Sequence, residues 1–274
     1  MTQAADFLTQ AGVIRFSVFA VIIVLMGLWE WRWPRRLHVV PHSRRSRWPS
    51  NFGIIALNGA AAGVLIPLGA VGVALLAQRQ GWGLFNLLPV PGWLAFVLSI
   101  VLLDLTIYLQ HLLLHAIPVL WRIHRMHHAD LDLDVSSGGR FHTLEILLSA
   151  LVKMAVVLML GAPALAVLAF EVLLNATSMF NHSNVYLPPA VDRVLRGLLV
   201  TPDMHRVHHS IKRVETNSNY GFNLSWWDRL FRTYCAQPAR GHQDMVIGIE
   251  QFRHLSDQRF DRMWMIPFRS DDAR

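Results

Sequence analysis

Residues 93–128 read WLAFVLSIVLLDLTIYLQHLLLHAIPVLWRIHRMHH. The part from Trp93 to Ile117 is apolar and long enough to cross a bilayer as a helix, which takes about 20 residues. The part from His111 to His128 instead carries five histidines. We therefore expect a membrane helix that ends in a histidine-rich polar segment.

The rest of the chain repeats the membrane signal. Hydrophobic residues make up 53% and charged residues 16% of the 274 residues, a composition typical of a multi-span membrane protein. Gly161-Ala162-Pro163 predicts a tight turn between two helices, and the chain becomes polar after Asn181. The predicted fold class is an all-α membrane bundle of four or five spans with a cytosolic helical cap that carries the histidines. The other expected spans are Ala11 to Trp29, Phe52 to Ala77, Leu144 to Leu160 and Ala164 to Phe180.

Basic residues near the span ends predict the orientation, because Lys and Arg stay on the cytoplasmic side. The first connection, residues 30–51, carries six arginines, whereas residues 78–92 carry only Arg79. Alternation from there places the N-terminus outside, and the histidines and the C-terminus in the cytoplasm. The arginines of the first connection, Arg47 among them, are interpreted as a solvated or headgroup-facing flank.

Two further features limit the class of protein. The net charge of +7 is concentrated in blocks beside apolar runs, which favours an anionic lipid surface over nucleic acid. The single cysteine, Cys235, cannot form an internal disulfide. The first apolar run lacks a small-residue cleavage signature, and we expect it to remain as an anchor.

Histidines in three clusters point to metal chemistry. Residues three and four apart share a helix face, so the pair is expected to project together and each triplet to offer two or three imidazoles to one point. Imidazole binds Fe, Zn, Cu and Ni, and one ion accepts four to six ligands, so eight clustered histidines imply two metals. The clusters are His111 with His115, His124 with His127 and His128, and His205 with His208 and His209.

Isolated histidines and acids near the apolar runs are candidates to complete the site. His182 is expected to face His111 and His115 across the bundle, and His142 is either a ligand or a helix-capping residue. Asp104 lies two helical turns before His111 and is expected to accept the free N–H of a ligand histidine. Glu145 is interpreted either as the same kind of partner for His142 or as an acid favoured in a first helical turn. The histidines expected at the surface are His38, His42, His242 and His254.

The ordered motifs resemble one known family, the membrane-bound fatty acid hydroxylase and sterol desaturase superfamily. The similarity extends from about Trp93 to Tyr234. Leu112, Thr143 and Arg232 depart from the family pattern, which often has arginine, proline and glycine there. The motifs that carry the resemblance are DLTIYLQHLLLH at 104–115, LWRIHRMHH at 120–128, FNHSN at 180–184, PDMHRVHHS at 202–210, NYG at 219–221 and WWDRLF at 226–231.

The resemblance implies a helical membrane bundle with a non-haem diiron centre beneath a cytosolic cap. It also implies a division into N-terminal membrane helices with a basic loop (1–92), a catalytic domain (93–234) and a C-terminal cytosolic tail (235–274). Two iron ions would be the cofactor, although zinc could replace them in purified or crystallised protein. The implied ligands are His111, His115, His124, His127, His128, His182, His205, His208 and His209.

The function that follows is O₂-dependent oxidation of a C–H bond in a membrane lipid. Hydroxylation and desaturation stay open, as do sterol, fatty acyl, ether lipid, sphingolipid and carotenoid substrates. Met154, Met159 and Met179 are candidates to line a substrate channel, although such residues are more often simply core or lipid-facing. Electrons would come from a separate donor protein. Its proposed docking residues are Arg122, Arg125, Arg206, Lys212 and Arg213.

Two other classes of protein remain as alternatives. A histidine-rich metal transporter or metal-binding protein would need its ligands near mid-membrane. A haem-binding membrane cytochrome would need single axial histidines on facing spans.

Overall fold

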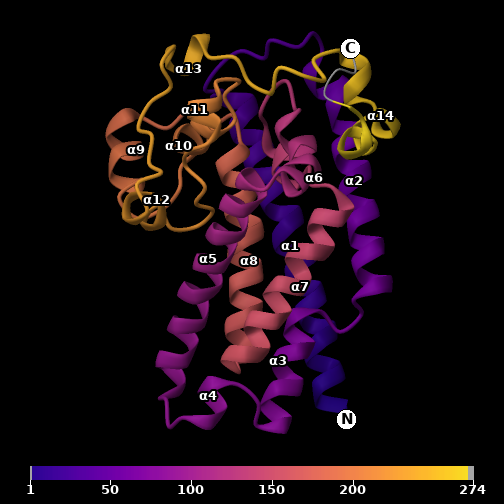
Figure 1. Ribbon diagram of the computed structural model, residues 1–274, viewed down its shortest axis with the longest axis vertical. Coiled ribbons are helices and arrows are strands. Elements are labelled where there is room, and N and C mark those ends of the chain that lie inside the picture. Colours follow the sequence, from indigo (N-terminus) through magenta and orange to yellow (C-terminus); the bar gives the residue numbers. More distant parts are fainter. Residues whose placement is uncertain (1, 271–274) are drawn as a thin grey trace.

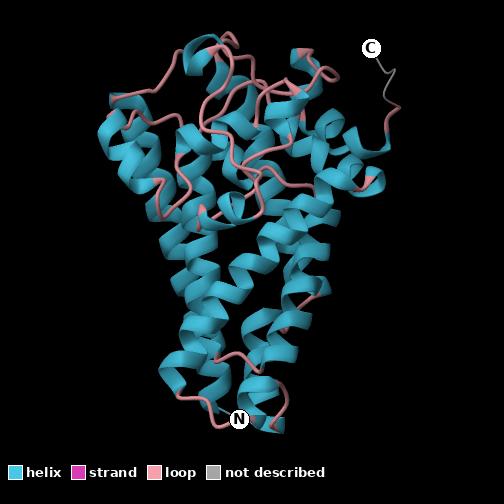
Figure 2. Cartoon of the chain, turned by 60° about the vertical axis from the view of Figure 1, so that its left-hand side comes forward, coloured by secondary structure: helices cyan, strands magenta, loops and turns pink. Residues whose placement is uncertain are grey.

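Long helices stand side by side in one half of the molecule, and short helices and loops form a cap over the other (Figures 1 and 2). The computed structural model describes residues 2–270, which form helices, three isolated β-bridges and no strand. Five segments are long and apolar enough to cross a membrane. The predicted all-α membrane bundle is therefore confirmed. Its long helices are α1 (Thr2–Arg32), α2 (Ser43–Leu65), α3 (Gly69–Gln80), α5 (Gly92–Ala116), α7 (Thr143–Leu160) and α8 (Ala164–His182).

The expected span from Phe52 to Ala77 is two helices instead of one. The chain breaks between α2 and α3 at Ile66-Pro67-Leu68. Pro67 has no N–H to donate and its ring clashes with a continuing helix, so the break follows from the sequence. Both pieces belong to one 45-residue apolar segment, which also includes the short α4 (Leu84–Leu87) at the end of the molecule away from the cap (Figure 1).

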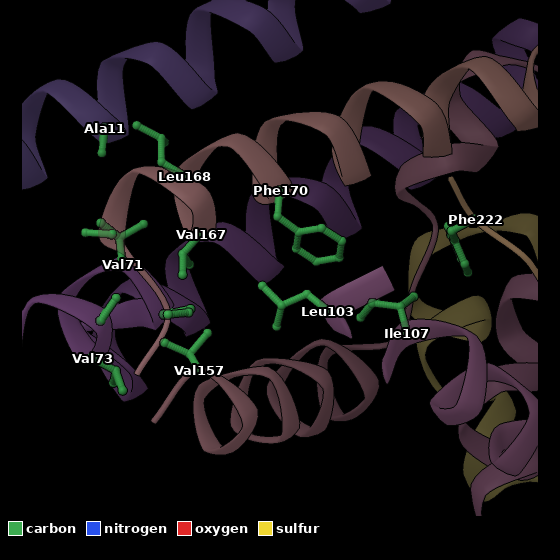
Figure 3. Packing of buried hydrophobic residues seen from close by; sticks show 14 residues of the cluster. Ala11, Val71, Val73, Leu103, Ile107, Val157, Val167, Leu168, Phe170 and Phe222 are labelled. Carbon is green, nitrogen blue, oxygen red and sulfur yellow. The ribbon is translucent and has the colours of Figure 1, made fainter. Parts of the chain in front are cut away.

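The predicted turn at Gly161 joins α7 and α8. Gly161 has φ 64°, a left-handed conformation that glycine adopts without steric cost. Below the cap, a shared hydrophobic core joins α3, α5, α7 and α8 (Figure 3). Leu103, Val157, Val167 and Phe170 are almost completely buried within it. This packing fixes the spans from which the histidines project.

The cap consists of short segments whose polar groups bond to one another. η1 (Val135–Gly139) packs on α8, where a Cβ on Gly138 would lie 2.8 Å from the carbonyl oxygen of Ser178. Only glycine allows this approach. The other cap elements are α6 (Pro118–His128), α9 (Pro189–Leu195), α10 (Pro202–His208), α11 (Arg213–Thr216), α12 (Trp226–Leu230), α13 (Gly241–Asp244), η2 (Leu255–Gln258), α14 (Phe260–Trp264) and η3 (Ile266–Phe268).

Arg47 is the centre of a buried ionic network that holds the segment after α6. Its guanidinium donates to the carboxylates of Asp130 and Asp134, both at 2.8 Å, to the carbonyl oxygen of Asp132 at 2.7 Å, and to Ser137 Oγ at 3.0 Å. Burial opposes ionisation of Asp130, but Arg47 holds the pKa of that carboxyl well below its usual range. Arg47 has no exposed surface, so the expectation that it belongs to a solvated flank is wrong. Its burial is possible because several acceptors surround the charge.

A second ionic cluster lies among the spans. Glu171 of α8 accepts hydrogen bonds from Arg15 of α1 at 2.6 Å and from Lys153 of α7 at 2.7 Å. The Glu171 side chain is 8% exposed and that of Lys153 is 16% exposed. One carboxylate therefore joins three spans through two cations.

We expect Glu171→Gln to destabilise the bundle by about 3 kcal/mol, because it leaves a largely buried ammonium without its counterion. Thermal unfolding of the purified protein in detergent measures this effect. The exposed Glu250 provides a matched control, since Glu250→Gln should leave the melting temperature unchanged. Equal melting temperatures for both variants would show that the cluster does not stabilise the bundle.

Candidate metal centre

Nine of the chain's 14 histidines converge where the spans meet the cap, in two groups. Within each group, the potential ligand atoms all lie within 4.8 Å of one another. The spans contribute from their cap ends, since His111 and His115 lie near the end of α5 and His182 ends α8. The five-histidine group is His111, His115, His124, His128 and His208, and the four-histidine group is His127, His182, His205 and His209.

Each histidine triplet is divided between the two groups. In α6, His124 and His128 are four residues apart and share a face, so they belong to the five-histidine group, whereas His127 belongs to the other. The triplet within 205–209 is divided the opposite way, with His208 alone in the five-histidine group. The expectation that each triplet offers two or three imidazoles to one point is confirmed with two, and the third ring of each triplet belongs to the other group, because neighbouring positions on a helix differ by about 100°.

Hydrogen bonds from Nδ1 to a backbone carbonyl or a carboxylate oxygen orient five of these rings. Carbonyl and carboxylate oxygens only accept, so each Nδ1 carries the hydrogen and a neutral ring keeps its lone pair on Nε2. This pattern is typical of histidines that bind metal through Nε2. The acceptors are the carbonyl oxygens of Tyr220 for His111 (2.7 Å), Arg140 for His127 (3.1 Å), Ser178 for His182 (2.6 Å) and Ser218 for His208 (2.7 Å), and the Glu145 carboxylate for His124 (2.8 Å).

Contacts between Nε2 atoms show that the site fits cations. The Nε2 atoms of His111 and His124 lie 3.2 Å apart, and those of His127 and His182 lie 3.0 Å apart. All four rings donate from Nδ1, so two lone pairs face each other in each contact. Two lone pairs cannot form a hydrogen bond, and buried groups of this kind are costly unless a cation binds them. The arrangement fits one cation in each group.

The protonation of the cap histidines supports this conclusion. Burial, followed by repulsion from neighbouring imidazoles, lowers their pKa well below the ordinary 6.5. The folded protein therefore holds these rings neutral, the form that binds metal. The rings are His127, His128, His205, His208 and His209.

This protonation predicts how stability depends on pH. Because the unfolded chain takes up protons at a higher pH than the folded chain, the metal-free protein should be fully stable above about pH 7 and lose stability as the pH falls below about 6.5. The metal-loaded protein should keep its stability to a lower pH than the metal-free protein, since bound cations compete with protons for the imidazoles. Thermal melts of both forms between about pH 8 and pH 5 test this. A metal-free melting temperature that stays constant across the range would contradict it.

Glu145 has a function that the sequence left open. It lies in the first turn of α7 and accepts the Nδ1 hydrogen of His124, not of His142. A carboxylate in this position fixes the orientation of the ring and strengthens its lone pair. We expect Glu145→Leu to weaken metal binding roughly 10- to 100-fold, and Glu145→Gln, which keeps an acceptor oxygen, to weaken it much less. Metal titration of the two variants measures the difference, and equal affinities would contradict a specific function of the acceptor.

Within residues 2–270, Asp104 accepts no hydrogen bond from a histidine. Its carboxylate accepts hydrogen bonds from Asn223 Nδ2 at 2.8 Å, from the Leu224 backbone at 3.2 Å and from Trp227 Nε1 at 2.9 Å. Asp104 thus anchors the segment whose Tyr220 carbonyl orients His111. The sequence placed Asp104 on the correct face of α5 but could not show that a loop lies between it and the ring.

Two predicted histidines are placed differently from what the sequence indicated or left open. His142 lies outside both groups, and His182 has other neighbours than expected. His142 precedes α7, where its Nδ1 accepts from the Leu144 backbone, and its Nε2 lies 3.2 Å from the carbonyl oxygen of Trp264. It thus has the capping function that the sequence allowed. His182 joins His127 instead of His111 and His115.

Of the four histidines expected at the surface, His42 and His254 are exposed and His38 is half-buried. His242 is buried, with its Nε2 3.6 Å from the Asp203 carboxylate, so that expectation is wrong. The polar residues around it gave no sign that a loop folds over the ring.

A cavity of about 220 Å³ opens beside the five-histidine group. His111 and His124 line it together with Ile107, Phe141 and Phe222. Among the methionines considered as channel residues, Met179 lines this cavity, whereas Met159 is 65% exposed on the outside of the bundle. The cavity connects an apolar space between the spans to the histidines.

The basic surface expected to dock a partner is smaller than the sequence indicated. Arg125 and Arg206 are 3% and 1% exposed, and Arg122 donates to the carbonyl oxygens of Pro267 and Arg269. Lys212 and Arg213 are exposed. The alternation of charged and apolar residues in the motifs does not show which arginine side chains are buried.

Two departures from the family pattern have structural counterparts. Arg232 has φ 60°, a conformation that favours the glycine usual there. Thr143 is the first residue of α7, a position where proline is also favoured. Leu112 is half-buried on α5, and nothing in the structure explains that substitution.

Comparison with known proteins agrees with this geometry. A family model described as fatty acid hydroxylase matches residues 96–233. Ornithine lipid hydroxylase OlsE of Rhizobium tropici is 33% identical over 151 residues, which are 55% of this chain and 45% of that protein. Human (Homo sapiens) alkylglycerol monooxygenase is 28% identical over 214 residues, 74% of this chain and 46% of the relative.

A cholesterol 25-hydroxylase-like protein of Danio rerio is 30% identical over 139 residues, 49% of this chain and 53% of the relative. The chain thus spans about half the length of the curated relatives it matches. No solved structure matches it significantly.

Proposed function

Because this chain belongs to the fatty acid hydroxylase family, we propose that it is a membrane oxygenase that uses O₂ to oxidise a C–H bond of a lipid. The observation that carries the proposal is the convergence of nine histidines in two groups, one of them beside an apolar cavity. A catalytic centre next to an apolar space suits a lipid chain better than a polar metabolite. The relatives named as hydroxylases or monooxygenases of lipids support the same reaction class.

We propose that the two groups hold two iron ions. When bound, reduced iron supplies the O₂ chemistry that oxidises an unactivated carbon. The chain contributes position and environment: the Nδ1 acceptors fix the rings, and Phe141, Phe222 and Ile107 keep water from the cavity. A transporter would need ligands along its spans, whereas these histidines gather at the cap ends of α5 and α8.

Isotope labelling tests the reaction. Protein loaded with iron is incubated with ¹⁸O₂, a chemical reductant and, separately, an ornithine lipid, an alkylglycerol and cholesterol. We expect about two irons per chain and ¹⁸O in a hydroxylated product of at least one lipid. Loss of two hydrogens without ¹⁸O would identify a desaturase. Bound iron with no oxidised product from lipids extracted from the native membrane would contradict an oxygenase.

We further propose that the histidine end faces the cytoplasm, as the arginines of the first connection favour. Cys235, the only cysteine, is half-buried in the cap and provides a natural site for labelling. A membrane-impermeant maleimide should label it in inverted vesicles and not in sealed right-side-out cells. The opposite pattern would reverse the orientation without affecting the metal site.

The electron donor is proposed to dock near His115. His115 is half-buried, whereas the other eight clustered histidines are buried, and its Nδ1 lies 3.3 Å from Asn217 Oδ1. Asn217 directly follows α11, which begins at the exposed Arg213 and is preceded by the exposed Lys212. These cations suit an acidic redox protein.

A further inference from the structure

Three residues that line the cavity beside the histidines each carry a buried acceptor oxygen without a partner in the described part of the chain. These oxygens are Asn58 Oδ1 from α2, Gln110 Oε1 from α5 and Glu145 Oε2 from α7, and none has a hydrogen-bond partner within residues 2–270. Asn58 and Glu145 are 7% and 4% exposed. A buried acceptor that stays unbonded costs free energy, so three of them around one cavity indicate a ligand with donors.

The orientation of the Asn58 amide follows from its other contact. Asn58 Nδ2 lies 2.8 Å from the carbonyl oxygen of Phe141, which can only accept. The amide nitrogen must therefore face Phe141, and Oδ1 is left as the free atom. Glu145 is fixed in the same way, because Oε1 accepts from His124 and Oε2 remains.

The size of the cavity limits where the ligand's donor lies. A volume of about 220 Å³ holds only a segment of a lipid, and His111 and His124 line the same space. A group bonded to Asn58 or Gln110 must then lie within a few bonds of the carbon that faces the histidines. A carboxylate there would place further acceptor oxygens against these three and would be disfavoured.

We propose that Asn58 and Gln110 select lipids that carry a hydroxyl or amide N–H donor close to the oxidised carbon. This inference rests on the proposed function only in taking the cavity as the substrate site. It narrows the substrate from any apolar chain to one with a hydrogen-bond donor in the segment that enters the cavity. A site that bonds a donor discriminates strongly against an analogue that lacks it.

Binding of three probes of equal chain length tests the proposal: hexadecan-1-ol, hexadecanamide and hexadecane, in competition with radiolabelled hexadecan-1-ol on the metal-loaded protein. Gln110→Met and Asn58→Leu remove the acceptors with little change in volume. Each variant should bind the alcohol and the amide roughly fivefold more weakly than the wild type does, and should bind hexadecane as tightly as the wild type or more tightly. Comparison of variant with wild type cancels the partition of each probe into detergent.

Two further variants separate recognition from folding. Gln110→Glu keeps an acceptor oxygen and should keep the preference for the alcohol. Asn86→Leu is the control for Asn58→Leu, because it makes the same change at an exposed residue away from the cap. Unchanged alcohol binding in both Gln110→Met and Asn58→Leu would overturn the proposal, since the acceptors would then hold water only. Binding is read without turnover, so selectivity with no ¹⁸O incorporation would contradict the oxygenase and leave only the preference for a lipid with a hydrogen-bond donor.

Discussion

Replacing His127 or His208 by alanine will lower the bound metal to at most one ion per chain and reduce turnover by more than about a hundredfold. His127 belongs to the four-histidine group and His208 to the five-histidine group, so each variant removes a ligand from a different position. The larger loss of metal is expected for His127→Ala, which leaves three imidazoles, whereas His208→Ala leaves four. Metal analysis of the purified variants, together with lipid oxidation, measures both effects.

The exposed His254 provides the matched control for these two variants. His254→Ala removes an imidazole from the cap without touching either group and should retain metal and activity. Full metal content in His127→Ala or His208→Ala would contradict the assignment of these residues as ligands. Loss of metal in His254→Ala would show that metal binding is sensitive to substitutions in the cap outside the two histidine groups.

Arg47→Met will destabilise the protein by about 3–5 kcal/mol, because it leaves the buried carboxylates of Asp130 and Asp134 without their main counterion. Methionine keeps much of the side-chain volume, so the loss reports on charge and hydrogen bonds. Arg140 compensates only in part, since its Nη1 lies 4.0 Å from Asp130 and donates to Asn51 Oδ1. Thermal unfolding in detergent measures the change, and metal should be lost with it because the segment follows α6.

Arg45, two residues earlier and exposed, is the control for this substitution. Arg45→Met removes the same charge from α2 and should shift the melting temperature little. If both variants melt at the wild-type temperature, the ionic network does not hold the cap together. If both are equally unstable, the net charge of α2 matters and not the contacts of Arg47.

The spans could be predicted because apolar length is a local property of the sequence. Even the break at Pro67 follows from chemistry that is visible in the sequence. The burial of Arg47 could not be foreseen, since its acceptors come from residues 83 and 87 positions away in the chain. The local sequence around an arginine in a basic block does not distinguish a side chain that faces lipid headgroups from one that is buried against carboxylates.

The sequence indicated the histidines of both groups, with His142 as a further candidate, but not how they divide between the groups. Spacing identified eight of the nine histidines, and the position of His182 at the end of an apolar run indicated the ninth. Their division into two groups depends on how α6 and α10 are rotated against the spans. The same limit applies to Asp104, which the sequence paired with a ring and the fold pairs with a loop. Glu145 could have been assigned to His124 only by knowing that α7 begins beside α6.

Because α6 and α10 each give imidazoles to both groups, the two positions share their scaffolding. A cation bound at one position would hold α6 and α10 in place, and with them rings of the second group. Loading should consequently show positive cooperativity, with few molecules carrying a single ion. The protein would then exist mainly in two forms, empty and doubly filled, and the supply of metal would determine which form dominates.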